Sequence, residues 1–361
     1  MPILIDKGSS VTPWTGTVNA FSVEGDGGGK CTRIALINNM PDAALEDTER
    51  QFFELLEAAS EGEPVRVTLF SFPEITRDVR GKRRLHEAYS GMEDLWNGQF
   101  DAAIVTGTEP RQPDLRLEPF WQTFTSTIDW AEENTASTVL SCLAAHAGVL
   151  YTDGIERQPL SDKQFGVFDF EQPNAHPLLE GTPGHIRIPH SRWNEVKEES
   201  LASSGYIVLT KSASAGADLF VKRRKGSLFV HFQGHPEYGS RTLLKEYRRD
   251  IKRFIRHERE TYPSMPKGYF NADASALLND FRQRAELLRC EALLEEFPEA
   301  AVSACLENGW HSSAVSIYRN WLRYIASRKI GTSDEGGVAR ARTCEPAGFA
   351  AAGTTWARGK M

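Results

Sequence analysis

One cysteine lies where a strand-like segment turns into a helix-like one. Residues 137–141 (STVLS) suit a buried strand, and the alanine-rich stretch after Cys142 has high helix propensity. At such a turn the side chain is lifted out of the packed layer, and the positive end of the helix dipole favours its thiolate. The first helix amides can also hold an oxyanion once the sulfur has attacked a carbonyl. On this stretch alone, a small cysteine buried in the interior is an equally good interpretation.

A second stretch supplies a base for that thiol. In residues 229–240 (FVHFQGHPEYGS) an apolar strand ends at Gly234, and His235 and Glu237 follow before a long helix. His235 can take a proton from a thiol, and Glu237 can orient the imidazole through its other nitrogen. Ligands of open α/β sheets bind at the carboxyl ends of the strands, which is where these residues fall. The alternative is a loop histidine without a catalytic role.

The elements that must position these residues alternate along the first half of the chain. Short apolar segments typical of strands occur at 33–37, 66–72, 101–107 and 137–141. Amphipathic segments typical of helices occur at 45–60 and 117–134. Strands that alternate with helices predict an α/β fold with a mostly parallel sheet flanked by helices.

The second half adds more strands and then only helices. Further strands are predicted at 185–191, 205–212, 217–222 and 227–237, and further helices at 240–259, 273–297 and 310–328. We therefore expect a flexible N-terminal lead-in (1–30), a catalytic domain (31–265), a C-terminal helical extension packed on it (266–330) and a disordered tail (331–361).

The composition excludes several classes of function. The 361 residues carry a formal net charge of −7 and show no basic stripe of the kind that binds nucleic acid. No segment approaches the roughly 20 apolar residues of a membrane span, and the N-terminus does not read as a secretory signal. Five scattered cysteines without a CxxC pair indicate neither a disulfide framework nor a zinc site. Together these features predict a cytoplasmic protein without a nucleic-acid or membrane partner.

A set of motifs in a fixed order resembles a known family. "SCLAAHA" with "QGHPEY" resembles the nucleophile and the His-x-Glu of class I glutamine amidotransferase-like folds. The closer resemblance is to the homoserine O-acyltransferases, which include O-succinyl- and O-acetyltransferases of methionine biosynthesis. It also rests on "INNMPD", "DTERQFFELL", "FDAAIVTGTEP", "IPHSRW", "LLKEYRRDI" and "WHSSAVSIYRNWLRYIA", and it extends from about residue 31 to 328.

The resemblance implies a role for each matching residue. Cys142 would accept the acyl group of acyl-CoA as a thioester, with His235 as proton acceptor and Glu237 as its partner. The resemblance also implies substrate-binding roles for three residues: Lys163, Ser191 and Arg249. A planar guanidinium such as that of Arg249 suits bidentate binding of an α-carboxylate.

The chemistry that follows is a ping-pong acyl transfer to the hydroxyl of L-homoserine. The backbone amides of Leu143 and Gly107 would hold the oxyanion of each tetrahedral intermediate. Acyl-CoA is then a co-substrate, no cofactor or metal is required, and the family implies a homodimer.

Three positions depart from the family pattern or stand out. The lysines that usually follow N-x-M-P are absent after Met40-Pro41. Arg111 occupies the position that helps select the acyl donor, where an arginine could pair with the free carboxylate of a succinyl group, which favours succinyl-CoA. His146 follows Cys142 by one helical turn and could tune the thiolate or simply pack in the helix.

Other functions remain open at this point. An acetyl-CoA donor or a serine acceptor would need the same machinery. A glutamine amidotransferase or amide hydrolase is a second enzymatic alternative, although Ser141 replaces the glycine that usually precedes the cysteine of that class. A non-catalytic relative is the third alternative, and the presence of Cys142, His235 and Glu237 together argues against it.

Overall fold

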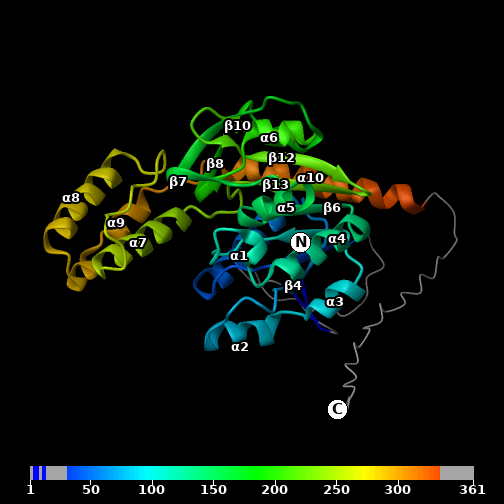
Figure 1. The fold of residues 1–361 in the computed structure, drawn as a ribbon, viewed down its shortest axis with the longest axis horizontal. Coiled ribbons are helices and arrows are strands. Elements are labelled where there is room, and N and C mark those ends of the chain that lie inside the picture. Colours follow the sequence, from blue (N-terminus) through cyan, green and yellow to red (C-terminus); the bar gives the residue numbers. More distant parts are fainter. Residues whose placement is uncertain (1–2, 8–9, 14–30, 334–361) are drawn as a thin grey trace, which may run out of the picture.

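A nine-stranded sheet forms the centre of the molecule (Figure 1). The computed structural model describes residues 3–7, 10–13 and 31–333. The strand order is β2-β1-β4-β3-β5-β6-β13-β12-β9. Six neighbouring strands are parallel: β1 (Leu4–Lys7), β4 (Val65–Phe70), β3 (Thr32–Ile37), β5 (Ala102–Val105), β6 (Ser137–Ser141) and β13 (Ser227–Phe232). The antiparallel strands are β2 (Ser10–Pro13), β12 (Leu219–Arg224) and β9 (Ile207–Val208).

Helices cover both faces of this sheet because its strands are apolar on both sides. One face packs against α1 (Asp42–Ala59) and α10 (His311–Ser333), and the other against α4 (Trp121–Asn134) and α5 (Leu143–Asp153). The short helices α2 (Val79–Ala88), α3 (Met92–Asn97) and α6 (Glu198–Ser203) lie between strands. The predicted α/β class with a mostly parallel sheet is thereby confirmed.

A second, antiparallel sheet projects from the first. Its order is β11-β10-β7-β8, and its bounds are β7 (Gln158–Glu171), β8 (His185–Glu195), β10 (Lys211–Ser212) and β11 (Gly216–Ala217). The sequence patterns did not indicate β7, because its first half is exposed and polar and gives no alternation. The β7–β8 register shifts between Pro159 and Gln164, which leaves Lys163 outside the regular ladder.

The C-terminal helices belong to two different cores. α7 (Thr242–Ile255), α8 (Ala272–Leu288) and α9 (Glu299–Ala304) pack together and against β7, at one side of the molecule (Figure 1). α10 instead returns to the central sheet, where Tyr318 and Trp321 join the core shared by β3, β4 and α1. The expected helical extension is therefore partly a layer of the main domain.

The structure differs from expectation in three places. The prediction of a flexible lead-in is wrong for β1 and β2, which pair at the edge of the sheet, and Ile3 is buried in the main core. The predicted helix 273–297 is interrupted at Arg289, whose backbone is left-handed with φ 39°. α10 continues to Ser333, past the expected start of the tail; residues 14–30 and 334–361 lie outside the described part.

Candidate active site

Cys142 occupies a strained turn between β6 and α5. Its φ is 54° and its ψ −112°, a backbone conformation that non-glycine residues rarely adopt. The Cys142 N–H donates to the Phe232 carbonyl at 2.8 Å, so the turn is tied to the neighbouring strand. Leu143 is the first helical residue, whose amide has no acceptor within the helix. The sulfur thus stands at a helix N-terminus with free backbone donors beside it, as the sequence predicted.

His235 reaches the same place from the adjacent strand. β13 runs parallel to β6 with Phe232 opposite Ser141, so both chains leave the sheet at the same edge. The charge of Cys142 and a hydrogen bond with its side chain both raise the pKa of His235, so the two side chains lie close together. Its Nδ1 lies 2.9 Å from Glu237 Oε1, and its ring stacks on Tyr238 with centroids 4.2 Å apart. His235 therefore interacts with both of the other predicted catalytic side chains.

The His235 proton is held by two negative partners. Burial by itself lowers the pKa of His235, but the charges of Cys142 and Glu237 and the hydrogen bonds to both raise it well above its ordinary value. This direction favours an imidazolium beside the sulfur at neutral pH. A cation in contact with the sulfur is what a reactive thiolate requires.

Ser141 takes part in this network. Its hydroxyl donates to Glu237 Oε1 at 3.3 Å, and the same oxygen faces His235. Within the described part of the chain, Glu237 Oε2 is buried without a hydrogen-bond partner. The serine that departs from the amidotransferase pattern thus helps to hold the acid that orients the base.

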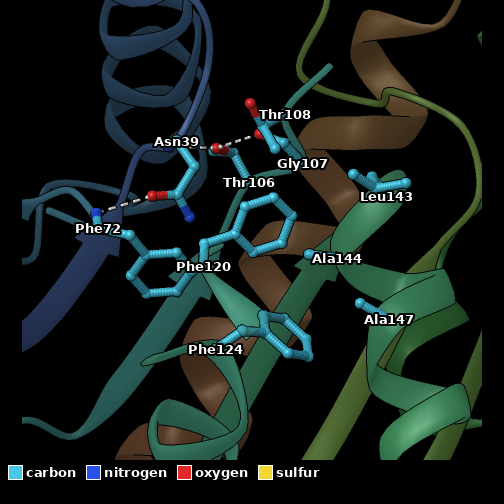
Figure 2. A pocket seen from close by; sticks show the side chains of 10 residues that line it. All are labelled: Asn39, Phe72, Thr106, Gly107, Thr108, Phe120, Phe124, Leu143, Ala144 and Ala147. Atoms are coloured by element: carbon cyan, nitrogen blue, oxygen red, sulfur yellow. Dashed lines mark hydrogen bonds between the residues drawn. The ribbon is translucent and has the colours of Figure 1, made fainter. Parts of the chain in front are cut away.

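Gly107 and Leu143 approach each other at the expected oxyanion site. A Cβ on Gly107 would lie 3.0 Å from the Leu143 nitrogen, a tight contact that glycine avoids. Figure 2 shows the small pocket next to them. The rings of Phe120 and Phe124 line it on one side and Ala144 on the other. Asn39 closes its far side, donating from its N–H to Thr106 Oγ1 and accepting from the Phe72 N–H.

The three predicted substrate-binding residues converge on one carboxylate. Lys163 Nζ lies 3.4 Å from Glu246 Oε2, the Ser191 hydroxyl donates to that oxygen, and Arg249 Nη2 lies 3.6 Å from it. Tyr238, which stacks on His235, donates to the other oxygen at 2.7 Å. Glu246 therefore links the three predicted substrate-binding residues, through Tyr238, to His235.

Glu246 was not singled out in the sequence. It lies in "KEYRRD", where a glutamate reads as part of a solvated helix face. Burial by itself raises the pKa of Glu246, but Lys163 and Arg249 outweigh it and lower the pKa, so the carboxylate stays charged. Asp250 accepts from Lys163 at 3.2 Å and from Arg249 at 3.3 Å. Only its neighbours on β7 and β8 identify Glu246 as part of a site.

Arg111 lines a wider cleft outside the small pocket. Glu74, Thr108, Glu109 and Phe120 are among its other lining residues, and Thr108 and Phe120 also line the pocket of Figure 2. The Arg111 side chain is exposed. Its backbone N–H donates to the buried carboxylate of Glu118, which fixes the loop.

Asp42 follows Met40-Pro41, where the family resemblance leads us to expect lysines, and it has a structural role in this chain. Its carboxylate accepts from Arg77 Nη1 at 3.1 Å and from the Asp78 N–H at 2.6 Å. It therefore points toward the start of α2 and fastens the 38–42 loop. Arg77 also donates to the carbonyl of Met40 and to the Ser71 hydroxyl.

Neither a metal-binding cluster nor a membrane-spanning helix occurs among the described residues. No group of three or more His, Cys, Asp and Glu side chains there could hold a metal ion. None of the helices described is long and apolar enough to cross a bilayer.

Comparison with known proteins bears on this arrangement. The sequence model of a family described as homoserine O-succinyltransferase matches residues 25–332. A homoserine O-succinyltransferase of Rhodopseudomonas palustris is 45% identical over 294 residues, which cover 81% of this chain and 88% of the relative. One of Methylorubrum extorquens is 42% identical and covers 82% of this chain and 88% of its own length.

Among solved structures, a glutamine amidotransferase of Thermotoga maritima is 12% identical, covers 82% of this chain and 98% of its own, and has a TM-score of 0.40. That likeness says nothing about activity. The match to the family model and the identity to its curated members extend over both strands that carry Cys142 and His235. The chain belongs to the homoserine O-succinyltransferase family.

Proposed function

We propose that this protein transfers the succinyl group of succinyl-CoA to the hydroxyl of L-homoserine, in two stages, through a thioester on Cys142. Family membership supports the reaction, which belongs to methionine biosynthesis. The observation that supports the mechanism is the closeness of His235 to a cysteine on a strained strand–helix turn, where the cysteine raises the pKa of the histidine.

In the first stage the Cys142 thiolate attacks the thioester carbonyl of the donor. The amides of Leu143 and Gly107 hold the resulting oxyanion. Collapse of the intermediate breaks the bond to the CoA sulfur, which takes the proton of the His235 imidazolium and leaves as CoA thiol. The succinyl group stays on Cys142, and the imidazole is neutral.

In the second stage His235 acts as the base. Once Cys142 is acylated, its negative charge no longer raises the pKa of His235. The neutral imidazole takes the hydroxyl proton of homoserine, whose oxygen attacks the acyl carbonyl. Collapse then breaks the bond to sulfur, forms the ester and restores the thiolate beside an imidazolium.

The acceptor, L-homoserine, is a zwitterion, and α7 carries groups of both signs that could pair with its two charges. Arg249 supplies a guanidinium for the α-carboxylate, with its side chain 49% exposed and hence accessible. Glu246 and Asp250 supply carboxylates for the ammonium group. Lys163 and Ser191 hold Glu246 in place.

Arg111 is the residue we assign to the choice of donor. It lines the cleft that joins the apolar pocket beside Gly107, so a succinyl chain entering from the cleft would bring its free carboxylate toward a guanidinium. Acetyl-CoA has no such group to pair.

The experiment is a donor-by-acceptor matrix with intact-protein mass spectrometry. Succinyl-CoA without acceptor should add one succinyl mass, homoserine should remove it, and Cys142→Ser should gain no thioester. Absence of a covalent succinyl adduct on wild-type protein would reject the two-stage mechanism. Acylation by acetyl-CoA, or transfer to serine, at equal rates would reject the substrate assignment, and ammonia from glutamine would point to amide hydrolysis.

We also propose a cytoplasmic homodimer that uses acyl-CoA as a co-substrate and needs no cofactor or metal. The requirement for a free Cys142 thiol supports a reducing compartment. Light scattering coupled to size-exclusion chromatography measures the oligomeric state. Undiminished turnover after dialysis against EDTA is expected, and loss of activity that zinc or magnesium restores would contradict the proposal.

A further inference from the structure

Two buried polar side chains lie next to the catalytic pair without a role in the mechanism. His146 is four residues after Cys142, on α5, and Gln233 is two residues before His235, just past β13. Their exposed fractions are 3% and 0%. His146 Nε2 lies 2.9 Å from Gln233 Oε1. This contact joins the element that carries the nucleophile to the one that carries the base.

The partners of Gln233 determine which atom is the donor. Its Nε2 donates to the carbonyls of Val196 at 3.1 Å and Ala217 at 2.7 Å, and its Oε1 accepts from the Val196 N–H at 2.8 Å. These backbone groups fix the orientation of the amide, because reversing it would place acceptor against acceptor. His146 Nε2 must therefore carry the hydrogen and donate to Gln233 Oε1.

Burial excludes a charged role for His146. Burial lowers the pKa of His146 to about 3, so the ring is neutral at physiological pH. A neutral imidazole that donates to Gln233 cannot stabilise a thiolate by its charge. All four hydrogen-bonding sites of the Gln233 amide are then in use, which is what a rigid buried link requires.

The catalytic pair needs such a link. The ladder between β6 and β13 ends at the pair Ser141 and Phe232, and beyond it one chain enters a helix while the other enters a loop. The backbone hydrogen bond from Cys142 N–H to the Phe232 carbonyl and the side-chain hydrogen bond from Ser141 to Glu237 tie the two chains near that point. His146 and Gln233 supply a further tie one helical turn further on.

We propose that the hydrogen bond from His146 to Gln233 fixes α5 against the His235 loop, and so holds the Cys142 sulfur at bonding distance from the His235 imidazole. His146 is thus a positioning residue for acyl transfer. The proposal rests on the proposed function, since it assigns this link to the same Cys142–His235 pair.

The test compares three substitutions at one position. His146→Phe removes the hydrogen-bond donor but keeps a ring of similar volume. His146→Asn keeps a polar group that is too short to reach Gln233. His146→Gln places an N–H near the position of the original Nε2. We expect kcat to fall about 10- to 100-fold in the first two, because a misplacement of about 1 Å costs that much. KM for succinyl-CoA and homoserine should stay within about twofold, and His146→Gln should recover most of kcat.

A matched control separates positioning from stability. Asn320→Leu removes another buried polar side chain, on α10, which hydrogen-bonds the carbonyls of Leu178 and Glu180. It should lower Tm without changing kcat of the folded protein. If His146→Phe behaves in the same way, the proposal is wrong. If His146→Phe does not fold, equal kcat for the Asn and Gln variants overturns it.

A second measurement does not depend on succinyl transfer. Iodoacetamide alkylates the thiolate, and mass spectrometry of the Cys142 peptide separates its rate from those of the other cysteines. We expect slower alkylation in His146→Phe, because the sulfur loses its contact with the imidazolium, and recovery in His146→Gln. Unchanged alkylation in all variants would reject the link even if the protein proves to catalyse another reaction.

Discussion

At the scale of single residues, the charge on one sulfur decides what His235 can do. While Cys142 is a thiolate, its charge and that of Glu237 hold a proton on the imidazole. In the proposed mechanism an acyl group would neutralise the sulfur, and Glu237 would remain as a negative partner at 2.9 Å from Nδ1. The same histidine can therefore donate a proton in the first stage and accept one in the second. No further acid or base is needed for the cycle to close.

Removing the charge of Glu237 should move the alkaline limit of the first stage. A histidine whose pKa is raised by its partners stabilises the folded state at pH values below its ordinary pKa of about 6.5. This stabilisation is lost as the pH rises through the raised pKa. In Glu237→Gln the pKa of His235 falls, so the imidazolium is lost at lower pH. We expect single-turnover release of CoA to decline at lower pH than in wild type, and kcat to drop roughly 10²- to 10⁴-fold.

The matched control is Glu132→Gln. Glu132 is also a buried acid, 4% exposed, but it pairs with Arg224 on the far side of α4. Its substitution should leave the pH profile of CoA release unchanged. An identical alkaline limit in wild type and Glu237→Gln would mean that Glu237 does not hold the His235 proton.

Arg111 should govern the preference between donors. An ion pair with the succinyl carboxylate contributes about 1.5–3 kcal/mol when hydrogen-bonded. We expect Arg111→Gln to lower kcat/KM for succinyl-CoA about 10- to 100-fold and to leave acetyl-CoA within about twofold. Arg116→Gln, on the same loop but paired with Asp114 and Glu156, is the control. Equal losses with both donors would show that Arg111 serves the loop and not the carboxylate.

At the scale of elements, the juxtaposition of Cys142 and His235 was predictable and that of Glu246 was not. Two apolar strands that each end in a reactive residue predict a shared sheet edge, and β6 and β13 are adjacent and parallel. Glu246 depends on a hairpin, β7–β8, whose polar first half has no strand periodicity. Contacts made by long-range pairing of an irregular strand leave no local signal in the chain.

Gly166 is the element-scale test of that hairpin. Its φ is 144°, and an added Cβ would lie 2.2 Å from the Lys267 carbonyl oxygen, a backbone atom that cannot turn away. β7 and the segment before α8 are joined there by hydrogen bonds between Val167, Lys267 and Phe165. We expect Gly166→Ala to reduce the free energy of unfolding by about 1–3 kcal/mol and to raise KM for homoserine, because Lys163 shifts with the strand.

Urea denaturation measures that change against Gly226→Ala. Gly226 lies in the β12–β13 turn with nothing within 4 Å of an added Cβ, so its substitution should change stability by less than about 0.5 kcal/mol. If both alanine variants are equally stable, the approach of β7 to Lys267 is not a tight contact in solution.

At the scale of the whole molecule, the last helix completes the first domain. α10 covers the same face of the sheet as α1, although more than 250 residues separate them. Asn320 donates to two carbonyls of the 178–180 segment, and Trp321 Nε1 donates to the Ser137 hydroxyl at 2.8 Å. Ser137 begins the strand that ends before Cys142, so the C-terminal helix supports the strand that positions the nucleophile. Its amphipathic pattern identified a helix, but which face of the sheet it would cover could not be predicted, because the central sheet is apolar on both faces.

Trp321 should therefore be one of the side chains on which the whole fold depends. It is 1% exposed in the main core, and replacing a buried tryptophan by alanine typically costs about 3–5 kcal/mol. We expect Trp321→Ala to lower the urea midpoint of the α/β core in a single transition, with activity lost along the same curve. Trp193→Ala is the control, since that side chain is 53% exposed and should change stability by less than about 0.5 kcal/mol. Two separate transitions in Trp321→Ala, with activity following the later one, would mean that α10 unfolds alone and that the site does not need it.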